Sequence, residues 1–375
     1  MNYPPQGPPP QGPPPGNFGA PQGHPGQWGP PPQQPPWPQQ QWPPSPPPKK
    51  HNGWKWALGA VALLAVIGVT AAVTISVSSG NDNGDPTPAR DTYGLASAND
   101  TGPVEIVTED PSCAAWKPII ETFGDTQRNG WDDRDPSVPA TQWTPEQRAQ
   151  YEEVRKAAIA AAEQTEPLVR LTPHRVMREF YEQFIAYSRA YSEAVPNYQP
   201  EDERLARVMT NTSAVLVYAC DAIDFKSAAA RSPLIQSAPT PTKVAPLTNP
   251  EDPTRFMPEP DPVCADWQEL LENFSRDTDA WQELDSNTPA SRWTPEQRQI
   301  IDATIPVFND FADRALEIAE RTSNPVLADF IAFSAQYRRA YAAALPSYTP
   351  ADSYLARTGY TAAATIYNAC KAPQG

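Results

Sequence analysis

The chain of 375 residues is long enough for two ordinary domains, and its charge is very unevenly distributed. Residues 1–80 contain three lysines and no acidic residue, whereas the remainder has 26 Lys and Arg against all 44 acidic residues, a net charge of −18. This acidity argues against a nucleic-acid partner and against adsorption to anionic lipid, because both need cationic side chains. It either keeps the protein soluble or attracts a basic partner.

Residues 1–48 form a Pro/Gln-rich segment that holds 21 of the 49 prolines, as in PPQGPPPQGPPP. Such a composition cannot bury a core, so we predict a disordered tail with polyproline II character. Trp28, Trp37 and Trp42 interrupt it. These rings could contact a partner groove, or the tail could be a plain spacer, and the sequence leaves both open.

Residues 49–78 are predicted to be a basic flank and a transmembrane helix. The run from Trp56 to Val77 has 22 uncharged residues, about 33 Å as a helix, which is enough to span a bilayer. It lies too far from the N-terminus to resemble a cleavable signal peptide. Lysines precede it and acidic residues follow it, so the positive-inside rule predicts a single-pass cell-membrane protein with a cytoplasmic N-terminus. Residues 79–110 are then a linker to extracytoplasmic domains.

The hexapeptide WTPEQR occurs twice, at 143–148 and at 293–298. Matching residues stay 150 or 151 positions apart from CAAW at Cys113 and CADW at Cys264 to the second cysteine of each copy. This is a duplicated domain and not a short solenoid repeat. We predict helical repeat 1 at 111–223, a Pro-rich, semi-rigid linker at 224–260, and helical repeat 2 at 261–373.

Each copy has the pattern of a helical bundle. Thr144-Pro145-Glu146-Gln147 and Thr294-Pro295-Glu296-Gln297 have the residues of a helix N-terminus with a capping box. Apolar residues then recur at spacings of three and four, and further helices are expected near 173–195 and 200–220, with copies near 325–345 and 350–370. The predicted fold is all-α: two tandem duplicated four-helix-bundle-like extracytoplasmic domains after a disordered tail and one transmembrane helix. Pro306 is expected to bend the long helix of the second copy.

The two copies exchange bulk between neighbouring helices. Small residues on one helix of the first copy are phenylalanines in the second, and a phenylalanine on the next helix becomes serine. The pairs are Ala158 and Phe308, Ala161 and Phe311, and Phe184 and Ser334. Cores tolerate volume-conserving changes best, so we predict that these positions share one contact and that Phe184 is buried.

Each copy has one cysteine at the start of its first helix and one at the end of its fourth. These two points share one end of an up-down-up-down bundle, and the predicted compartment is oxidising. We therefore predict disulfides Cys113–Cys220 and Cys264–Cys370. Of the three possible pairings, only this one is complete within each copy.

No catalytic, cofactor-binding or metal site is predicted. The extracytoplasmic part has one histidine, His174, so a Ser-His-Asp or Cys-His site is unsupported. Asp132, Asp133 and Asp135 could bind calcium, but the second copy reads WQELD there, which favours a solvated turn. We expect no cofactor.

A patch of Tyr and Arg recurs in both copies and could bind an aromatic, sugar or carboxylate ligand. Its members are Tyr187, Arg189, Tyr191, Tyr198, Tyr337, Arg339, Tyr341 and Tyr348. The alternative is an aromatic core seam with Arg189 paired to a carboxylate such as Asp202. The helical spacing of the tyrosines favours the core seam.

The Pro/Gln-rich start, the WKWALGAVALLAVIGV anchor, ASANDTGPVEIVTEDPSCAAW, WTPEQR and PSYTPADSYLA resemble the uncharacterised proline-rich single-pass membrane proteins of mycobacteria. The resemblance implies an actinobacterial cell envelope and implies no activity. We expect a non-enzymatic, membrane-anchored adaptor or scaffold with an envelope protein partner and no nucleic acid. One alternative is a binding module for a lipid or cell-wall fragment, and a weaker one is a carboxylate-based hydrolase.

Overall fold

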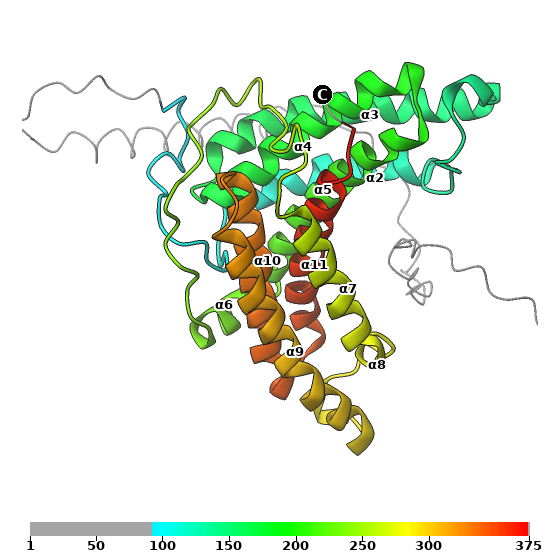
Figure 1. Ribbon diagram of the computed structural model, residues 1–375. Helices are drawn as coiled ribbons and strands as arrows, with labels where there is room; N and C mark the ends of the chain where they lie inside the picture. Colours follow the sequence, from blue (N-terminus) through cyan, green and yellow to red (C-terminus); the bar gives the residue numbers. More distant parts are fainter. Residues whose placement is uncertain (1–91, 374–375) are drawn as a thin grey trace, which may run out of the picture. The chain divides into compact units, whose positions relative to one another are not determined.

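The computed structural model describes residues 92–373, and this part of the chain is all-α, as predicted (Figure 1). The predicted tail at 1–48 and the predicted membrane span at 56–77 lie outside the described residues. Within residues 92–373, no helix is both long enough and apolar enough to cross a bilayer.

Four long helices form the first half of the described chain. They are α2 (Cys113–Arg128), α3 (Pro145–Leu171), α4 (Arg175–Ala194) and α5 (Glu203–Asp224). The second half has their counterparts in the same order. They are α7 (Cys264–Asp277), α9 (Pro295–Ala319), α10 (Pro325–Ala344) and α11 (Ser353–Ala369). Within each half, each of these helices packs against its successor along the chain.

Short elements join the long helices. They are η1 (Ala140–Gln142), η2 (Val195–Asn197), η3 (Pro200–Asp202), α6 (Ser227–Arg231), η4 (Ser232–Leu234), α8 (Asp279–Gln282), η5 (Ala290–Arg292), η6 (Leu345–Ser347) and η7 (Pro350–Asp352). Pro306 lies inside α9, which continues through it without a break.

The repeated hexapeptide begins α3 and α9, and nearly every residue in it has a local role. The Thr144 hydroxyl accepts from the Gln147 backbone N–H at 3.2 Å, and the Gln147 side chain accepts from the Thr144 N–H at 2.9 Å. Trp143 Nε1 donates to the Val138 carbonyl, and Arg148 donates to the Ala140 carbonyl. The second copy makes the same four hydrogen bonds. WTPEQR is therefore a helix start, as the sequence predicts.

Disulfides join Cys113 to Cys220 and Cys264 to Cys370, which are the two pairs named above. The joined Cα atoms are 5.5 and 5.8 Å apart. Each bond ties the start of the first helix of a half to the end of its last helix.

The exchange of bulk between the copies is visible in the aromatic contacts. Phe184 of α4 is buried, as predicted, and its ring centroid lies 5.2 Å from that of Trp116 and 6.1 Å from that of Phe123 on α2. In the second half, the counterparts of those two rings meet Phe311 of α9 instead, at 5.8 and 5.0 Å. The same space is thus filled from α4 in one half and from α9 in the other.

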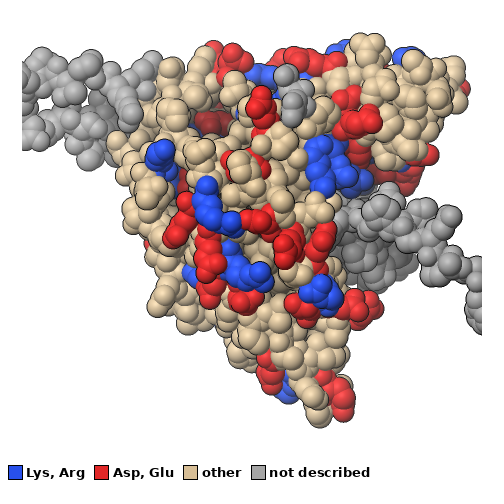
Figure 2. Space-filling model, in the orientation of Figure 1, with Lys and Arg blue, Asp and Glu red and all other residues tan. Residues whose placement is uncertain are grey.

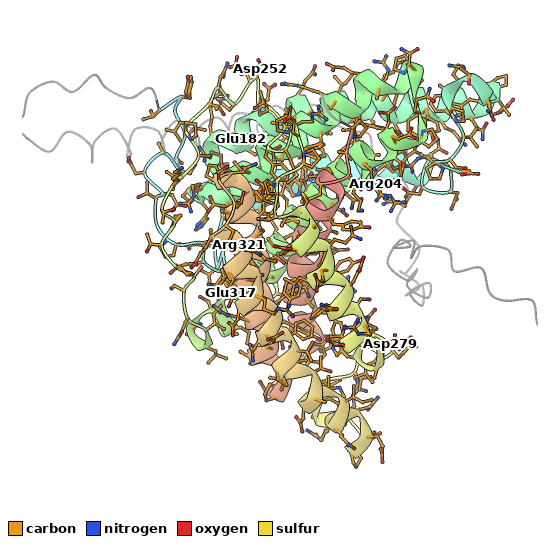
Figure 3. The ribbon with its side chains drawn as sticks, in the orientation of Figure 1. Glu182, Arg204, Asp252, Asp279, Glu317 and Arg321 are labelled. Atoms are coloured by element: carbon orange, nitrogen blue, oxygen red, sulfur yellow. A yellow bond between two sulfur atoms is a disulfide. The ribbon has the colours of Figure 1, made fainter. Side chains whose placement is uncertain are left out.

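The halves are not separate bodies joined by a tether. The helices α5 and α11 pack side by side, and so do parts of α4 and α10 (Figure 1). The rings of Phe180 and Phe330, which are counterparts in the two copies, stack at 3.9 Å with an angle of 2° between their planes. Arg204 of α5 (Figure 3) donates to Asn368 of α11 at 2.9 Å. A residue that contacts its own counterpart marks a twofold-like arrangement.

The segments predicted as linkers are partly built into this shared core. Val107 before α2 and Phe256 and Met257 before α7 are buried. The Gln183 side chain donates to the Thr254 carbonyl and accepts from the Phe256 N–H, so it holds the second segment in place. These segments contain only short apolar runs among prolines, too short for any periodicity to reveal them.

Candidate functional site

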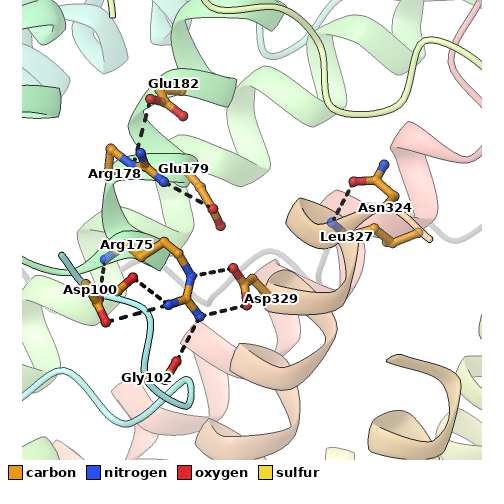
Figure 4. A network of polar contacts seen from close by, with 9 residues as sticks. All are labelled: Asp100, Gly102, Arg175, Arg178, Glu179, Glu182, Asn324, Leu327 and Asp329. Atoms are coloured by element: carbon orange, nitrogen blue, oxygen red, sulfur yellow. Dashed lines mark hydrogen bonds and ion pairs between the residues drawn. The ribbon is translucent and has the colours of Figure 1, made fainter. Parts of the chain in front are cut away.

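A cluster of charged side chains lies buried where the halves meet (Figure 4). Arg175, Arg178, Glu179 and Glu182 follow one another at helical spacing along the start of α4, which places them on one face. Asp329 of α10, the counterpart of Glu179, faces them. None of the five is more than 7% exposed. Buried charges are rare in proteins unless they are paired, so such a cluster is informative.

Arg175 is fully engaged. Its Nε and Nη2 donate to the two carboxylate oxygens of Asp329 at 2.7 and 3.0 Å, a bidentate pair. Its Nη1 and Nη2 also donate to the carbonyls of Asp100 and Gly102 at 2.8 and 3.1 Å. The Asp100 carboxylate in turn accepts from the Arg175 backbone N–H at 2.6 Å. One guanidinium therefore joins the segment before α2, helix α4 and helix α10.

Arg178, one turn further along α4, is engaged less completely. Its Nη2 donates to Glu179 at 3.3 Å, and its Nε lies 3.9 Å from Glu182, beyond hydrogen-bond distance. Within the described chain, Arg178 Nε, Glu179 Oε2 and Glu182 Oε1 have no hydrogen-bond partner. Buried polar atoms of this kind are few in native proteins, and each calls for an explanation.

Burial changes the protonation of the carboxyl groups. It raises the pKa of Glu182 to about 7, although the nearby Arg178 opposes this rise. Burial also raises the pKa of Glu179 well above its ordinary value, and the charge of Asp329 adds to that effect. At neutral pH the cluster therefore carries less negative charge than the number of its carboxyl groups suggests.

A cavity of about 120 Å³ lies beside the cluster. It is lined by residues of the segment before α2, by Arg175 and Arg178 of α4, and by Val244 to Leu247 of the inter-repeat segment. The Ser97 hydroxyl is buried and has no hydrogen-bond partner among residues 92–373. The lining of the cavity thus includes both polar residues and the apolar residues Val244 to Leu247.

No motif in the sequence singles out this site. Its one sequence signal is a run of charges at positions 175, 178, 179 and 182, among the apolar and aromatic residues of the first half of the helix, with an acid also at position 329. On a surface helix the same run would be an ordinary solvated face. Only the structure, in which nearly all sides of α4 are buried, shows that these charges are not exposed to solvent.

The predicted Tyr/Arg patch is not a surface. Tyr187, Tyr191, Tyr198, Tyr337, Tyr341 and Tyr348 are all buried, at 5% exposure or less. Tyr191 accepts from Trp131 Nε1 at 3.0 Å, and Tyr341 accepts from Trp281 Nε1 at 3.3 Å. The aromatic core seam is the arrangement observed, because these rings fill the space between the helices of each half.

The two arginines of that patch lie in separate ion pairs. Arg189 pairs with Glu166 at 2.8 Å and not with Asp202, while Arg339 pairs with Asp313. The Asp202 carboxylate instead accepts from the Gln199 backbone N–H at 2.8 Å, at the start of η3.

The other candidate residues have structural contacts. His174 precedes α4 and its Nε2 lies 2.9 Å from the Glu109 carbonyl oxygen. Asp135 accepts from Ser137 in a local turn. Within residues 92–373, no group of three or more His, Cys, Asp or Glu side chains is arranged to hold a metal ion.

Comparison with known proteins gives two matches. The model of a family described as "Mycobacterial ESX-1 associated protein" matches residues 95–375. The chain is also 47% identical over 342 residues to an uncharacterised protein of Mycolicibacterium smegmatis (strain MKD8), a match that covers 89% of this chain and 90% of that relative. No solved structure matches the chain.

Proposed function

We propose, because the chain belongs to the mycobacterial ESX-1 associated protein family, that it serves the ESX-1 secretion system as a non-enzymatic adaptor anchored in the cell membrane. The family match carries this proposal, since residues 95–375 include every helix described above. The envelope setting that the resemblance to mycobacterial membrane proteins implies agrees with it.

The anchor and its orientation are part of the proposal. The apolar run at 56–77, with lysines before it and acidic residues after it, supports a single span with the tail in the cytoplasm. Residues 92–373 then lie outside the membrane, where the disulfides Cys113–Cys220 and Cys264–Cys370 would persist.

The two halves are proposed to be duplicated four-helix units. The constant offset, the repeated capping boxes and the two equivalent disulfides support this. Joined through a common core, they can present one fixed surface to a partner. On the face drawn in Figure 2, acidic and basic side chains are interspersed, as on a surface that meets other proteins and not one that binds nucleic acid.

The alternatives have less support. A lipid-binding module would need a dry apolar cavity, whereas the cavity at the junction has charged residues such as Asp100 and Arg175 in its lining. A carboxylate-based hydrolase needs acids that its substrate can reach. Glu179, Glu182 and Asp329 are at most 7% exposed.

Deletion of the gene and in-cell crosslinking test the proposal. We expect export of ESX-1-dependent proteins to fall in the deletion strain and to return with the full chain, while export by an unrelated route stays constant. Crosslinking through an exposed position such as Asp252 should capture an ESX-1 component. Unchanged ESX-1 export, together with crosslinks only to proteins outside that system, would contradict the proposal.

A further inference from the structure

The inter-repeat segment presents threonines that alternate with prolines. Residues 236–249 belong to no helix or strand, and within them the chain reads Pro239-Thr240-Pro241-Thr242. Both threonines are exposed, and so is Lys243 after them. Proline fixes φ near its polyproline II value and has no N–H to donate, so this sequence favours an extended chain without hydrogen bonds of its own.

The protein anchors this stretch at both of its ends. On one side Ala238 is buried, and the Ser237 hydroxyl donates to Glu105 at 2.8 Å. On the other side Val244 is half-buried in the lining of the cavity. The residues between these points are exposed, except for the half-buried Pro241. The stretch is therefore held at the surface of the folded protein.

The hydroxyls of Thr240 and Thr242 are free in a way that those of helical threonines are not. Inside the helices, threonine hydroxyls donate to the carbonyl four residues earlier, as those of Thr165, Thr212 and Thr361 do. Within residues 92–373, neither the hydroxyl nor the backbone of Thr240 or Thr242 has a hydrogen-bond partner. An enzyme could reach both hydroxyls without unfolding any part of the described chain.

We propose that Thr240 and Thr242 are acceptor sites for O-linked glycosylation. Serine and threonine among prolines are the composition of O-glycosylated stalks, and here the structure adds exposed hydroxyls on an unpaired stretch of backbone. The inference rests on the orientation proposed above, which places residues 92–373 outside the membrane. Phosphorylation of the same hydroxyls is disfavoured there, because its donor, ATP, is cytoplasmic.

The reaction needs an activated sugar, and the class of donor that fits this location is a lipid-linked sugar phosphate in the membrane. The threonine Oγ attacks the anomeric carbon of that sugar. A carbon–oxygen bond to the threonine forms while the bond from the anomeric carbon to the phosphate oxygen breaks. The lipid phosphate leaves with that bonding pair, and the hydroxyl proton passes to a base of the transferase.

A sugar at either position would protect the segment that joins the two halves. Exposed stretches without secondary structure are preferred sites of proteolytic cleavage. The peptide bond after Lys243 is such a site, one residue beyond Thr242. A glycan there would cover this bond and would keep a partner protein from close contact with this part of the surface.

Mass spectrometry of the full chain purified from mycobacterial cells tests the inference. Trypsin releases residues 232–243, or residues 232–255 where a sugar hinders cleavage at Lys243. We expect this peptide to be heavier than a synthetic reference by the mass of one or more sugar residues. Fragmentation by electron transfer, which leaves the sugar attached, should place it on Thr240, Thr242 or both.

Matched variants show whether these two hydroxyls are the acceptors. Thr240→Val combined with Thr242→Val keeps the shape of both side chains, so folding should be unaffected while the added mass is lost. Brief digestion of the folded protein with trypsin should then cleave after Lys243 several-fold faster. Thr248→Val is the control, because Thr248 is exposed in the same segment but lies between Leu247 and Asn249. This variant should keep the full added mass.

An unmodified peptide, a phosphate in place of the sugar, or a sugar only at Ser232 or Ser237 would overturn the inference. The same sample separates this failure from a failure of the proposed orientation. Unmodified threonines together with intact disulfides Cys113–Cys220 and Cys264–Cys370 would overturn the glycosylation sites alone. Unmodified threonines together with free thiols would overturn these sites and count against the orientation as well. The export experiment tests the link to ESX-1 separately.

Discussion

The two halves share their frame and differ in where they place buried charge. In the first half, Arg134 lies 3.3 Å from the centroid of the Trp131 ring and pairs with Glu203, and both side chains are nearly buried. The residues 150 positions later, Leu284 and Ser353, cannot form that pair. The tryptophan–tyrosine hydrogen bond beside it is nevertheless present in both halves.

The second half has a different buried charge inside its own bundle. Arg338 of α10 is 2% exposed and lies 3.9 Å from the centroid of the Phe311 ring. Gly359 of α11 makes room for it, because a Cβ there would come within 3.2 Å of Arg338 Cγ. The first half has Ser188 and Met209 at these positions. The difference teaches that the two halves differ by paired changes, in which bulk lost at one position is gained at its neighbour.

Phe184→Ala should have the largest effect on stability, and it tests whether the two halves fill the same core space from different helices. Phe184 is fully buried against Trp116, so its loss should reduce the free energy of unfolding by about 3–5 kcal/mol. Adding Ala161→Phe copies the second half and should restore part of that loss. Urea unfolding of the full chain measures both. If Ala161→Phe makes Phe184→Ala worse, the two halves do not fill the same space.

Asp329→Asn tests how far one half depends on the other. It leaves Arg175 buried without its bidentate partner and should reduce the free energy of unfolding by about 3 kcal/mol, the lower end for a buried pair because Asp100 still faces Arg175. Asp313→Asn, at an exposed pair with Arg339, is the matched control and should change it by about 0–1 kcal/mol. If Asp329→Asn and Asp313→Asn reduce the free energy of unfolding equally in urea, the ion pair between Arg175 and Asp329 does not stabilise the contact between the halves.

Glu182→Gln should remove a contribution of Glu182 to the pH dependence of folding stability. The second half has no such contribution at the equivalent position, which is Ala332. Burial raises the pKa of Glu182 from 4.5 to about 7, so the folded chain binds more protons than the unfolded chain between these values. Its contribution to stability therefore falls as pH rises through this window, by about 2–3 kcal/mol. The variant should match the wild type near pH 5 and be more stable at pH 8. Equal stability at pH 8 in thermal unfolding would refute this.

Gly359→Ala should have the smallest effect of these changes, about 1–3 kcal/mol of destabilisation, because the new Cβ presses on Arg338 and on the Ser334 carbonyl. Combining Gly359→Met with Arg338→Ser recreates the pair of the first half. We expect that double variant to be more stable than Gly359→Met alone. A double-mutant cycle with no coupling energy would show that the two positions are independent.

Local features of the fold could be predicted from the sequence. The helix starts at Thr144 and Thr294 depend on residues within four positions of each other, and the disulfides follow from the repeat and the bundle order. The aromatic seam follows from helical spacing.

The junction could not be predicted, because it depends on which of several apolar faces meet. Helix α4 is buried on nearly all sides. Its charges at 175 to 182 would ordinarily indicate a solvent-exposed face, so the sequence does not predict this burial. Ser97 and Leu247 are brought to the same cavity only by the path of segments that have no periodic pattern. For this reason no pattern in the sequence predicts the candidate site.

The stacking of Phe180 on Phe330 has a consequence for the history of the protein. Two equivalent residues meet in this way at the axis of a homodimer, so on the proposed duplication a single-copy ancestor would have associated with itself here. Fusion into one chain makes that association independent of protein concentration. It also frees each copy to change alone. The ion pair from Arg175 to Asp329 has no mirror image, because Pro325 stands where the second arginine would be. Such a one-sided contact can evolve only after fusion, since every substitution in a homodimer appears twice.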